Sequence, residues 1–121
     1  MSERRTVRNM EIVLIRHGAT AGNIEKRYIG TTDEPLCDTG MVQIQEYMRA
    51  GCYPKVQALY VSPLKRCSQT AAFIYPDMKQ IIVQDFRECD FGKFEGKNYK
   101  ELTGNPQYQQ WIDSNGTLPF P

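Results

Sequence analysis

The sequence contains only one histidine and one tryptophan, and it has no excess of either charge. Its 15 basic residues balance its 14 acidic residues, for a formal net charge of +1. That balance gives no electrostatic basis for binding nucleic acid or an anionic membrane surface. Apolar runs such as Ile12–Ile15 are also far shorter than the ~20 residues that a membrane-spanning helix needs. A small molecule or another protein is therefore the expected partner.

Cysteine is scarce too, and its spacing is not that of a metal site. Cys37, Cys52, Cys67 and Cys89 form no C-x-x-C pair, which argues against bound zinc. Disulfide frameworks are typical of shorter secreted chains, so we interpret the four as reduced thiols. Residues 1–10 are basic but have no long apolar run behind them, so we predict a frayed tail and not a signal peptide. These features favour a cytoplasmic location.

The spacing of apolar residues predicts strands that alternate with helices. Strands are predicted at residues 11–15, 56–61 and 80–84, and helices at 38–50, 62–75, 99–102 and 107–113. This alternation is typical of a parallel α/β sheet with right-handed crossovers. We therefore predict one domain over residues 11–121, with a three-layer α/β/α architecture and a mostly parallel sheet.

Three polar residues follow the three predicted strands. His17 follows the first, Ser62 the second, and Glu88 lies a few residues after the third. Ser62 is also the predicted N-cap of a helix with Pro63 at its first helical position. Because ligands bind at the carboxyl ends of parallel strands, these segments are predicted to meet at one edge of the sheet.

The side chains expected at that edge are typical of an oxyanion site. Arg16 and Arg66 carry forked donors that match a phosphate group. Arg66 falls in the first turn of a helix, whose N-terminus adds positive potential and free N–H groups. Asn23 can donate a further hydrogen bond, and Gly18 lets the backbone turn sharply beside a ligand. We therefore predict a phosphate-binding site.

His17 and Glu88 would supply chemistry to a bound phosphate. A neutral imidazole can attack phosphorus to form phosphohistidine, and nearby arginines keep the imidazole unprotonated by lowering its pKa. A carboxylic acid can protonate the leaving oxygen and then, as a carboxylate, activate the attacking water. No metal or cofactor is needed where arginines and N–H groups stabilise the phosphoryl oxygens. Either residue alone is more often packed or solvated than catalytic, so the prediction depends on the combination.

The motifs that carry these residues resemble those of the histidine phosphatase superfamily, the fold group of cofactor-dependent phosphoglycerate mutase. "LIRHGATAGNIEKRYIGTTDEPLCDTG" resembles its opening signature, "VSPLKRCSQTA" its second and "FRECDFGKFEGKNYKEL" its third. The positions of the opening signature are Arg16, His17, Gly18, Thr20, Asn23, Arg27, Gly30, Asp33, Pro35, Leu36 and Gly40. Cys37 stands where the family usually has a threonine. The likeness runs from about residue 11 to residue 121.

The resemblance implies a metal-independent phosphatase in which His17 is the phosphorylated nucleophile and Glu88 the proton donor. The resemblance also implies that the phosphoryl group is held by Arg16, Asn23 and Arg66. It implies that the region of Gly30 borders the substrate. "ECDFGKFEGK" resembles α-ribazole phosphatase and broad-specificity phosphatases, whereas mutases typically carry R-H-Y-G directly after the acid. Hydrolysis of a small phosphorylated metabolite is expected, with inorganic phosphate as product. Mutase chemistry and an inactive phospho-ligand binding module are the alternatives.

The sequence departs from that family toward its C-terminus. Family members use a second histidine, late in the chain, to bind phosphate, whereas His17 is the only histidine here. The sequence also stops at "LPFP", where a G-G-E-S turn is expected. We interpret it as the N-terminal portion of a larger domain, with an incomplete sheet and reduced activity. An exposed apolar edge of such a portion would be covered by a homodimer or by exchanged elements.

Overall fold

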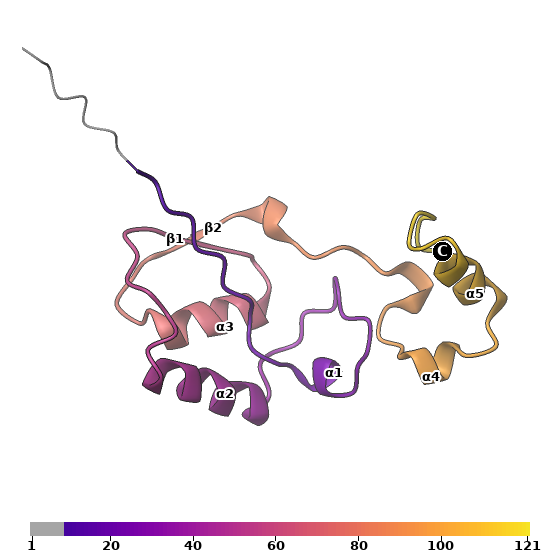
Figure 1. The fold of residues 1–121 in the computed structure, drawn as a ribbon, viewed down its shortest axis with the longest axis horizontal. Coiled ribbons are helices and arrows are strands. Elements are labelled where there is room, and N and C mark those ends of the chain that lie inside the picture. Colours follow the sequence, from indigo (N-terminus) through magenta and orange to yellow (C-terminus); the bar gives the residue numbers. More distant parts are fainter. Residues whose placement is uncertain (1–8) are drawn as a thin grey trace, which may run out of the picture.

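The computed structural model describes residues 9–121, so most of the predicted tail at residues 1–10 lies outside the described residues. Strand β1 (Leu59–Val61) pairs in parallel with β2 (Gln80–Ile82). Helix α3 (Lys65–Ile74) connects the two strands and contacts β1, and α2 (Asp38–Arg49) contacts α3 (Figure 1). A helix that connects two paired parallel strands confirms the predicted α/β class.

Several helix and strand boundaries differ from the predicted ones. Helix α2 matches its prediction, and Gly51 follows it with a φ of +71°, the conformation for which glycine is suited. Helix α3 begins at Lys65 with Leu64 as its N-cap, and not at Ser62. Both strands are shorter than predicted. Strand β2 ends at Ile82 because the chain turns at Val83 into η1 (Gln84–Phe86), a 3₁₀ turn.

The prediction of a buried strand at residues 11–15 is wrong for this structure. The segment adopts no strand conformation, and the side chains of Ile12 and Leu14 are 76% and 92% exposed. A parallel strand becomes buried when strands pair with it and helices cover its faces. Within residues 9–121 the sheet consists of β1 and β2 alone, so this segment has no strand partner.

An apolar groove of about 450 Å³ is lined by residues 12–15, by β1 and by α3. Strand β1 pairs with β2 at one edge, so its other edge is free within the described residues. Unpaired N–H and C=O groups along a strand edge can hydrogen-bond to another strand. The groove therefore combines apolar side chains with unpaired backbone.

The C-terminal part of the chain forms a second, aromatic core. The surrounding elements are η2 (Gly92–Phe94), α4 (Tyr99–Leu102) and α5 (Pro106–Asp113), and Phe94 is fully buried among them. Trp111 stacks on Tyr108, whose hydroxyl lies 2.9 Å from that of Tyr28. Burial and this hydrogen bond raise the pKa of Tyr28 to about 12. In Figure 1 the short helix α1 (Ala21–Ile24) lies between this core and the strands.

Two further features of the described residues concern the cysteines and the length of the helices. All four cysteines are free thiols. None of the helices within residues 9–121 has both the length and the apolar character needed to cross a bilayer.

Candidate active site

The main chain and helix α3 hold the turn that carries His17. Its Nδ1 lies 2.6 Å from the carbonyl oxygen of Gly18. Because a carbonyl oxygen only accepts hydrogen bonds, Nδ1 carries the proton, and Nε2 of the neutral ring keeps its lone pair. The Gly18 N–H donates to Thr70 Oγ1 at 3.0 Å, and that hydroxyl donates to the carbonyl of Arg66 at 2.7 Å. The His17 turn is therefore fixed to α3.

The surroundings of His17 favour its neutral form. Burial lowers the pKa of the imidazole from its ordinary 6.5, and the charges of Arg66 and Arg16 lower it further. The hydrogen bond to Gly18 and the carboxylate of Glu88 oppose this shift without outweighing it. The pKa of His17 therefore responds to the charge of the neighbouring Arg16 and to those of Arg66 and Glu88, which come from distant segments.

The single histidine makes this electrostatic environment directly measurable. We expect ¹H NMR titration of the ring protons to give a pKa below 6.5, because burial and two arginines disfavour the imidazolium form. Arg16→Gln should raise the pKa, because it removes one positive charge. Arg49→Gln, at the C-terminal end of α2, is the matched control and should leave the pKa unchanged. A wild-type pKa of 6.5 would show that His17 is solvated, and a pKa above 6.5 would show that it is paired with a carboxylate.

Arg66 is a buried charge whose guanidinium binds main-chain carbonyls. Its side chain is 1% exposed. Nη1 donates to the carbonyl of Thr32 at 2.7 Å, and Nη2 donates to that of Gly30 at 2.8 Å. Part of the fork that was predicted to bind phosphate therefore holds the loop at residues 30–32. The guanidinium has further N–H groups beyond these two, and a bound oxyanion would have to use them.

The start of α3 is capped by a residue from a distant loop. The Lys65 N–H donates to Asp33 Oδ1 at 2.7 Å, so a carboxylate occupies one of the helix N–H groups that we had expected to be free for phosphate. Ser62, the predicted N-cap, accepts from the Leu64 N–H at 3.4 Å and caps no N–H group of α3. Contacts on both sides of Asp33 fasten the loop to α3. Arg66 makes two of them before Asp33, and the Leu36 N–H donates to Gln69 at 2.7 Å after it.

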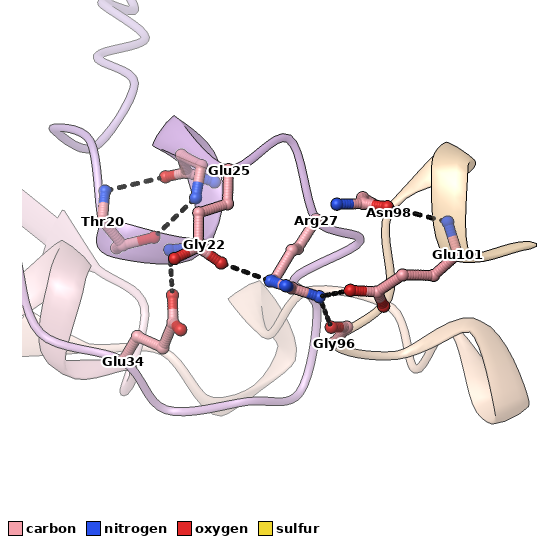
Figure 2. Close-up of polar contacts among 9 residues, drawn as sticks. Thr20, Gly22, Glu25, Arg27, Glu34, Gly96, Asn98 and Glu101 are labelled. Atoms are coloured by element: carbon pink, nitrogen blue, oxygen red, sulfur yellow. Dashed lines mark hydrogen bonds and ion pairs between the residues drawn. The ribbon is translucent and has the colours of Figure 1, made fainter.

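Asn23 lies on α1 and is oriented by a capping box. The Thr20 N–H donates to Asn23 Oδ1 at 3.0 Å, and the Asn23 N–H donates to Thr20 Oγ1 at 3.2 Å. The amide oxygen of Asn23 is thus occupied, so the side chain offers a ligand its NH₂ group. Figure 2 shows this turn, with the Gly22 N–H donating to Glu34 at 3.1 Å.

Gly30 is the residue at which three parts of the candidate site meet. Its carbonyl accepts from Arg66, and its N–H donates to the Glu95 carboxylate at 2.9 Å. A Cβ atom at this position would lie 1.8 Å from the carbonyl oxygen of Cys89. The main chain next to Glu88 therefore lies directly against Gly30. Glu88 itself is exposed and lines a hollow of about 290 Å³ with Thr31, Asp33, Pro63, Leu64 and Arg87.

Arg27 joins the loop after α1 to the region of α4. Its guanidinium pairs with Glu25 and, at 2.8 Å, with Glu101, and it donates to the carbonyl of Gly96 at 2.8 Å (Figure 2). Asn98 caps α4 by accepting from the Glu101 N–H at 3.0 Å. These contacts fix the aromatic core to the segment that carries Asn23 and Gly30.

The sequence-based prediction missed three residues that hold the site together, namely Asp33, Thr70 and Glu95. Asp33 and Thr70 lie in recognised motifs, but a motif alone does not show what its residues contact. Thr70 does carry a signal, because it falls one helical turn after Arg66. Glu95 accepts hydrogen bonds from residues more than 60 positions earlier, a distance that local patterns do not reveal.

The class of the protein follows from the fold and these motifs together. The family model of the histidine phosphatase superfamily (branch 1) matches residues 12–121. The chain therefore belongs to the histidine phosphatase superfamily.

The chain is similar to several individual proteins of this family. It is 37% identical over 97 residues to the uncharacterized phosphatase PhoE of Bacillus subtilis, covering 76% of this chain and 49% of PhoE. It superposes on the phosphoserine phosphatase of Entamoeba histolytica in complex with 3-phosphoglyceric acid, with a TM-score of 0.72 at 30% identity, covering 86% of this chain and 52% of the other. A candidate α-ribazole-5′-P phosphatase of Escherichia coli gives a TM-score of 0.72 at 27% identity, covering 87% and 54%. The chain thus spans about half the length of these relatives.

Proposed function

We propose that the protein is a metal-independent phosphomonoester hydrolase that works through a phosphohistidine at His17. The observation that carries this proposal is the hydrogen bond between Nδ1 and the Gly18 carbonyl, which leaves the Nε2 lone pair free. The lowered pKa of His17 supports it, because a nucleophilic nitrogen must be unprotonated. Membership of a phosphatase family supports it as well.

The proposed mechanism has two displacements at phosphorus. Nε2 of His17 attacks, the bond to the leaving oxygen breaks, and protonated Glu88 gives its proton to that oxygen. Water then gives a proton to the Glu88 carboxylate and attacks phosphorus, which breaks the P–N bond and releases phosphate. Arg16, Arg66 and the NH₂ group of Asn23 bind the phosphoryl oxygens and stabilise their charge throughout. Both catalytic groups return to their starting states, so no metal or cofactor takes part.

The proposed substrate is a small phosphorylated metabolite, either like α-ribazole phosphate or drawn from a broad range. The likeness to the Escherichia coli protein supports this class, as does the small hollow beside Glu88 and Thr31. Mutase-type phosphoryl transfer is the alternative, since the related phosphoserine phosphatase was solved with 3-phosphoglyceric acid. An inactive phospho-ligand module is a second alternative, favoured by the lack of a second histidine.

The experiment that tests this function is detection of phosphohistidine during turnover of p-nitrophenyl phosphate. Because the chain has one histidine, an acid-labile, base-stable phosphoryl group on a histidine can only lie on His17. Glu88→Gln should accumulate this intermediate, because nitrophenolate leaves without a proton whereas the attacking water needs a base. We expect its breakdown to slow by roughly 10²–10⁴-fold.

Glu46→Gln, on the exposed side of α2, is the control and should behave as wild type. The mechanism would be wrong if the phosphoryl group were found on a carboxylate, or if Glu88→Gln turned over normally. Conversion of 3-phosphoglycerate to its isomer would favour the mutase alternative. Binding of phosphate with neither reaction would favour the inactive module.

We also propose that residues 11–121 are the N-terminal portion of a larger domain, located in the cytoplasm, and that two copies of this chain associate through the apolar groove. The half-length match to relatives and the unpaired edge of β1 support the partial domain and the pairing. The free thiols support a reducing compartment.

Light scattering should give twice the monomer mass, and a monomer at high concentration would contradict pairing. A natural stop codon after Pro121 in an intact transcript would contradict the partial domain.

A further inference from the structure

We propose that Glu95 is a positioning residue that sets the place of Arg66 by clamping the loop at residues 30–32. The inference rests on the proposed function in one respect, namely that Arg66 binds the phosphoryl group. Glu95 contacts neither His17 nor Arg66 directly, so any effect on phosphate must pass through the loop.

The two charged side chains bind the same two loop residues. Glu95 Oε2 accepts from the N–H groups of Gly30 and Thr32 at 2.9 and 3.1 Å, and from the Thr32 hydroxyl at 2.5 Å. The carbonyls of the same residues accept from Arg66, at 2.8 Å for Gly30 and 2.7 Å for Thr32. A carboxylate therefore binds the donors of the loop while a guanidinium binds its acceptors.

The burial of Arg66 makes this clamp important. A buried charge is costly unless polar partners compensate for it. Among residues 9–121 the ion pairs are those of Arg27, so no carboxylate pairs with Arg66 directly. The two loop carbonyls are its compensating groups, and they face the guanidinium only while the loop keeps its conformation. Thr32 is exposed, so solvent can compete for this loop unless Glu95 holds it.

Glu95 also links the loop to the segment that carries the proposed acid. Its Oε1 accepts weakly from the Phe91 N–H at 3.3 Å, which ties the turn at residues 91–95 to the loop. Gly30 lies against the main chain of Cys89, next to Glu88. One carboxylate thus holds the Arg66 loop and the Glu88 segment in a fixed relation.

The chemistry of the contact requires a carboxylate at this position. Burial alone would raise the pKa of Glu95, but hydrogen bonds from the Thr32 hydroxyl and from the N–H groups of Gly30, Thr32 and Phe91 lower it overall. The side chain is therefore an acceptor at both oxygens. Glutamine at position 95 would place an NH₂ group opposite N–H donors, so Glu95→Gln should release the loop although it is nearly isosteric.

The test compares Glu95→Gln with Glu101→Gln. Glu101→Gln also removes a carboxylate, the one that pairs with Arg27. Glu101 makes no contact with the loop at residues 30–32 in these bonds, so this variant is the matched control. Two measurements are made on the folded chain: the affinity for inorganic phosphate, and the Nε–H resonance of Arg66 in ¹H–¹⁵N spectra. The first reports on the proposed function, and the second reports on the guanidinium without any ligand.

We expect Glu95→Gln to shift the Arg66 resonance and speed its exchange with water. We expect it to weaken phosphate binding roughly 10- to 10²-fold, the value of one hydrogen bond to a charged group. Glu95→Asp should recover part of both effects, and Glu101→Gln should change neither. An unchanged Arg66 resonance together with unchanged phosphate affinity in folded Glu95→Gln would overturn the inference. So would a lowered stability with an unchanged resonance, which is the result of a merely structural role.

Failure of the proposed function gives a different result. If wild type binds no phosphate but Glu95→Gln still shifts the Arg66 resonance, the clamp stands and the phosphate role of Arg66 falls. If Glu95→Gln does not fold, Thr32→Val replaces it, since that variant removes only the hydroxyl donor to Oε2. Thr32→Val should shift the Arg66 resonance in the same direction by a smaller amount, and no shift would overturn the inference.

Discussion

His17→Ala is expected to reduce hydrolysis of p-nitrophenyl phosphate by more than about 10³-fold, to the background rate. The expected loss is this large because the chain has no other histidine that could accept the phosphoryl group. Binding of inorganic phosphate should survive, because the donors of Arg16, Arg66 and Asn23 remain. Steady-state turnover and phosphate titration on the same preparation would separate loss of the nucleophile from loss of the site.

The control for His17→Ala is a measurement of whether the variant keeps the wild-type fold. The ring of His17 bonds only to the neighbouring carbonyl of Gly18, whereas the Gly18 N–H anchors the turn to Thr70. His17→Ala should therefore leave the emission of Trp111, the single tryptophan, and the urea midpoint close to wild type. Turnover that persisted in a folded His17→Ala variant would show that another group attacks phosphorus.

Among substitutions that add one methyl group to the candidate site, Gly30→Ala is expected to lower the free energy of unfolding most. The added Cβ would lie 1.8 Å from the Cys89 carbonyl oxygen, and main-chain atoms cannot rotate away as a side-chain tip can. Overpacking typically costs 1–3 kcal/mol, and a clash between two main chains lies at or above about 3 kcal/mol. Urea unfolding followed by Trp111 fluorescence measures the free energy of unfolding. Turnover should fall as well, since Gly30 contacts both the Arg66 guanidinium and the segment after Glu88.

Gly51→Ala is the matched control for Gly30→Ala. A Cβ at Gly51 meets nothing within 4 Å, but its φ of +71° disfavours alanine. Its cost should be about 1 kcal/mol from backbone strain alone. Equal and small effects at both positions would mean that the Cys89 segment is free to move away from Gly30.

Local patterns predicted most helices and the order of α2, β1, α3 and β2 correctly. Helix α2 could be predicted because its apolar spacing and Gly51 are local signals. The segment at residues 11–15 was misassigned because burial depends on neighbours. Its β-branched residues suit a central strand, yet Leu14 is 92% exposed where no strand pairs with it.

The contacts within the candidate site could not be predicted from local patterns. Motif spacing predicts that His17, Arg66 and Glu88 share one site, and the charges of Arg66 and Glu88 shift the pKa of His17 in opposite directions. It gave no sign that Arg66 would bind the carbonyls of Gly30 and Thr32, because those bonds join residues more than 30 positions apart. Nor did it show that the α3 N-terminus is already capped by Asp33.

The apolar groove beside β1 has a consequence for every stability measurement on this chain. Where two copies associate through it, folding is linked to association, and mass action makes the melting temperature rise with protein concentration. A variant that folds normally but pairs poorly would then look destabilised in a dilute sample and normal in a concentrated one. Midpoints for wild type, Gly30→Ala and Gly51→Ala are therefore comparable only at a common concentration, and a dilution series would reveal the linkage.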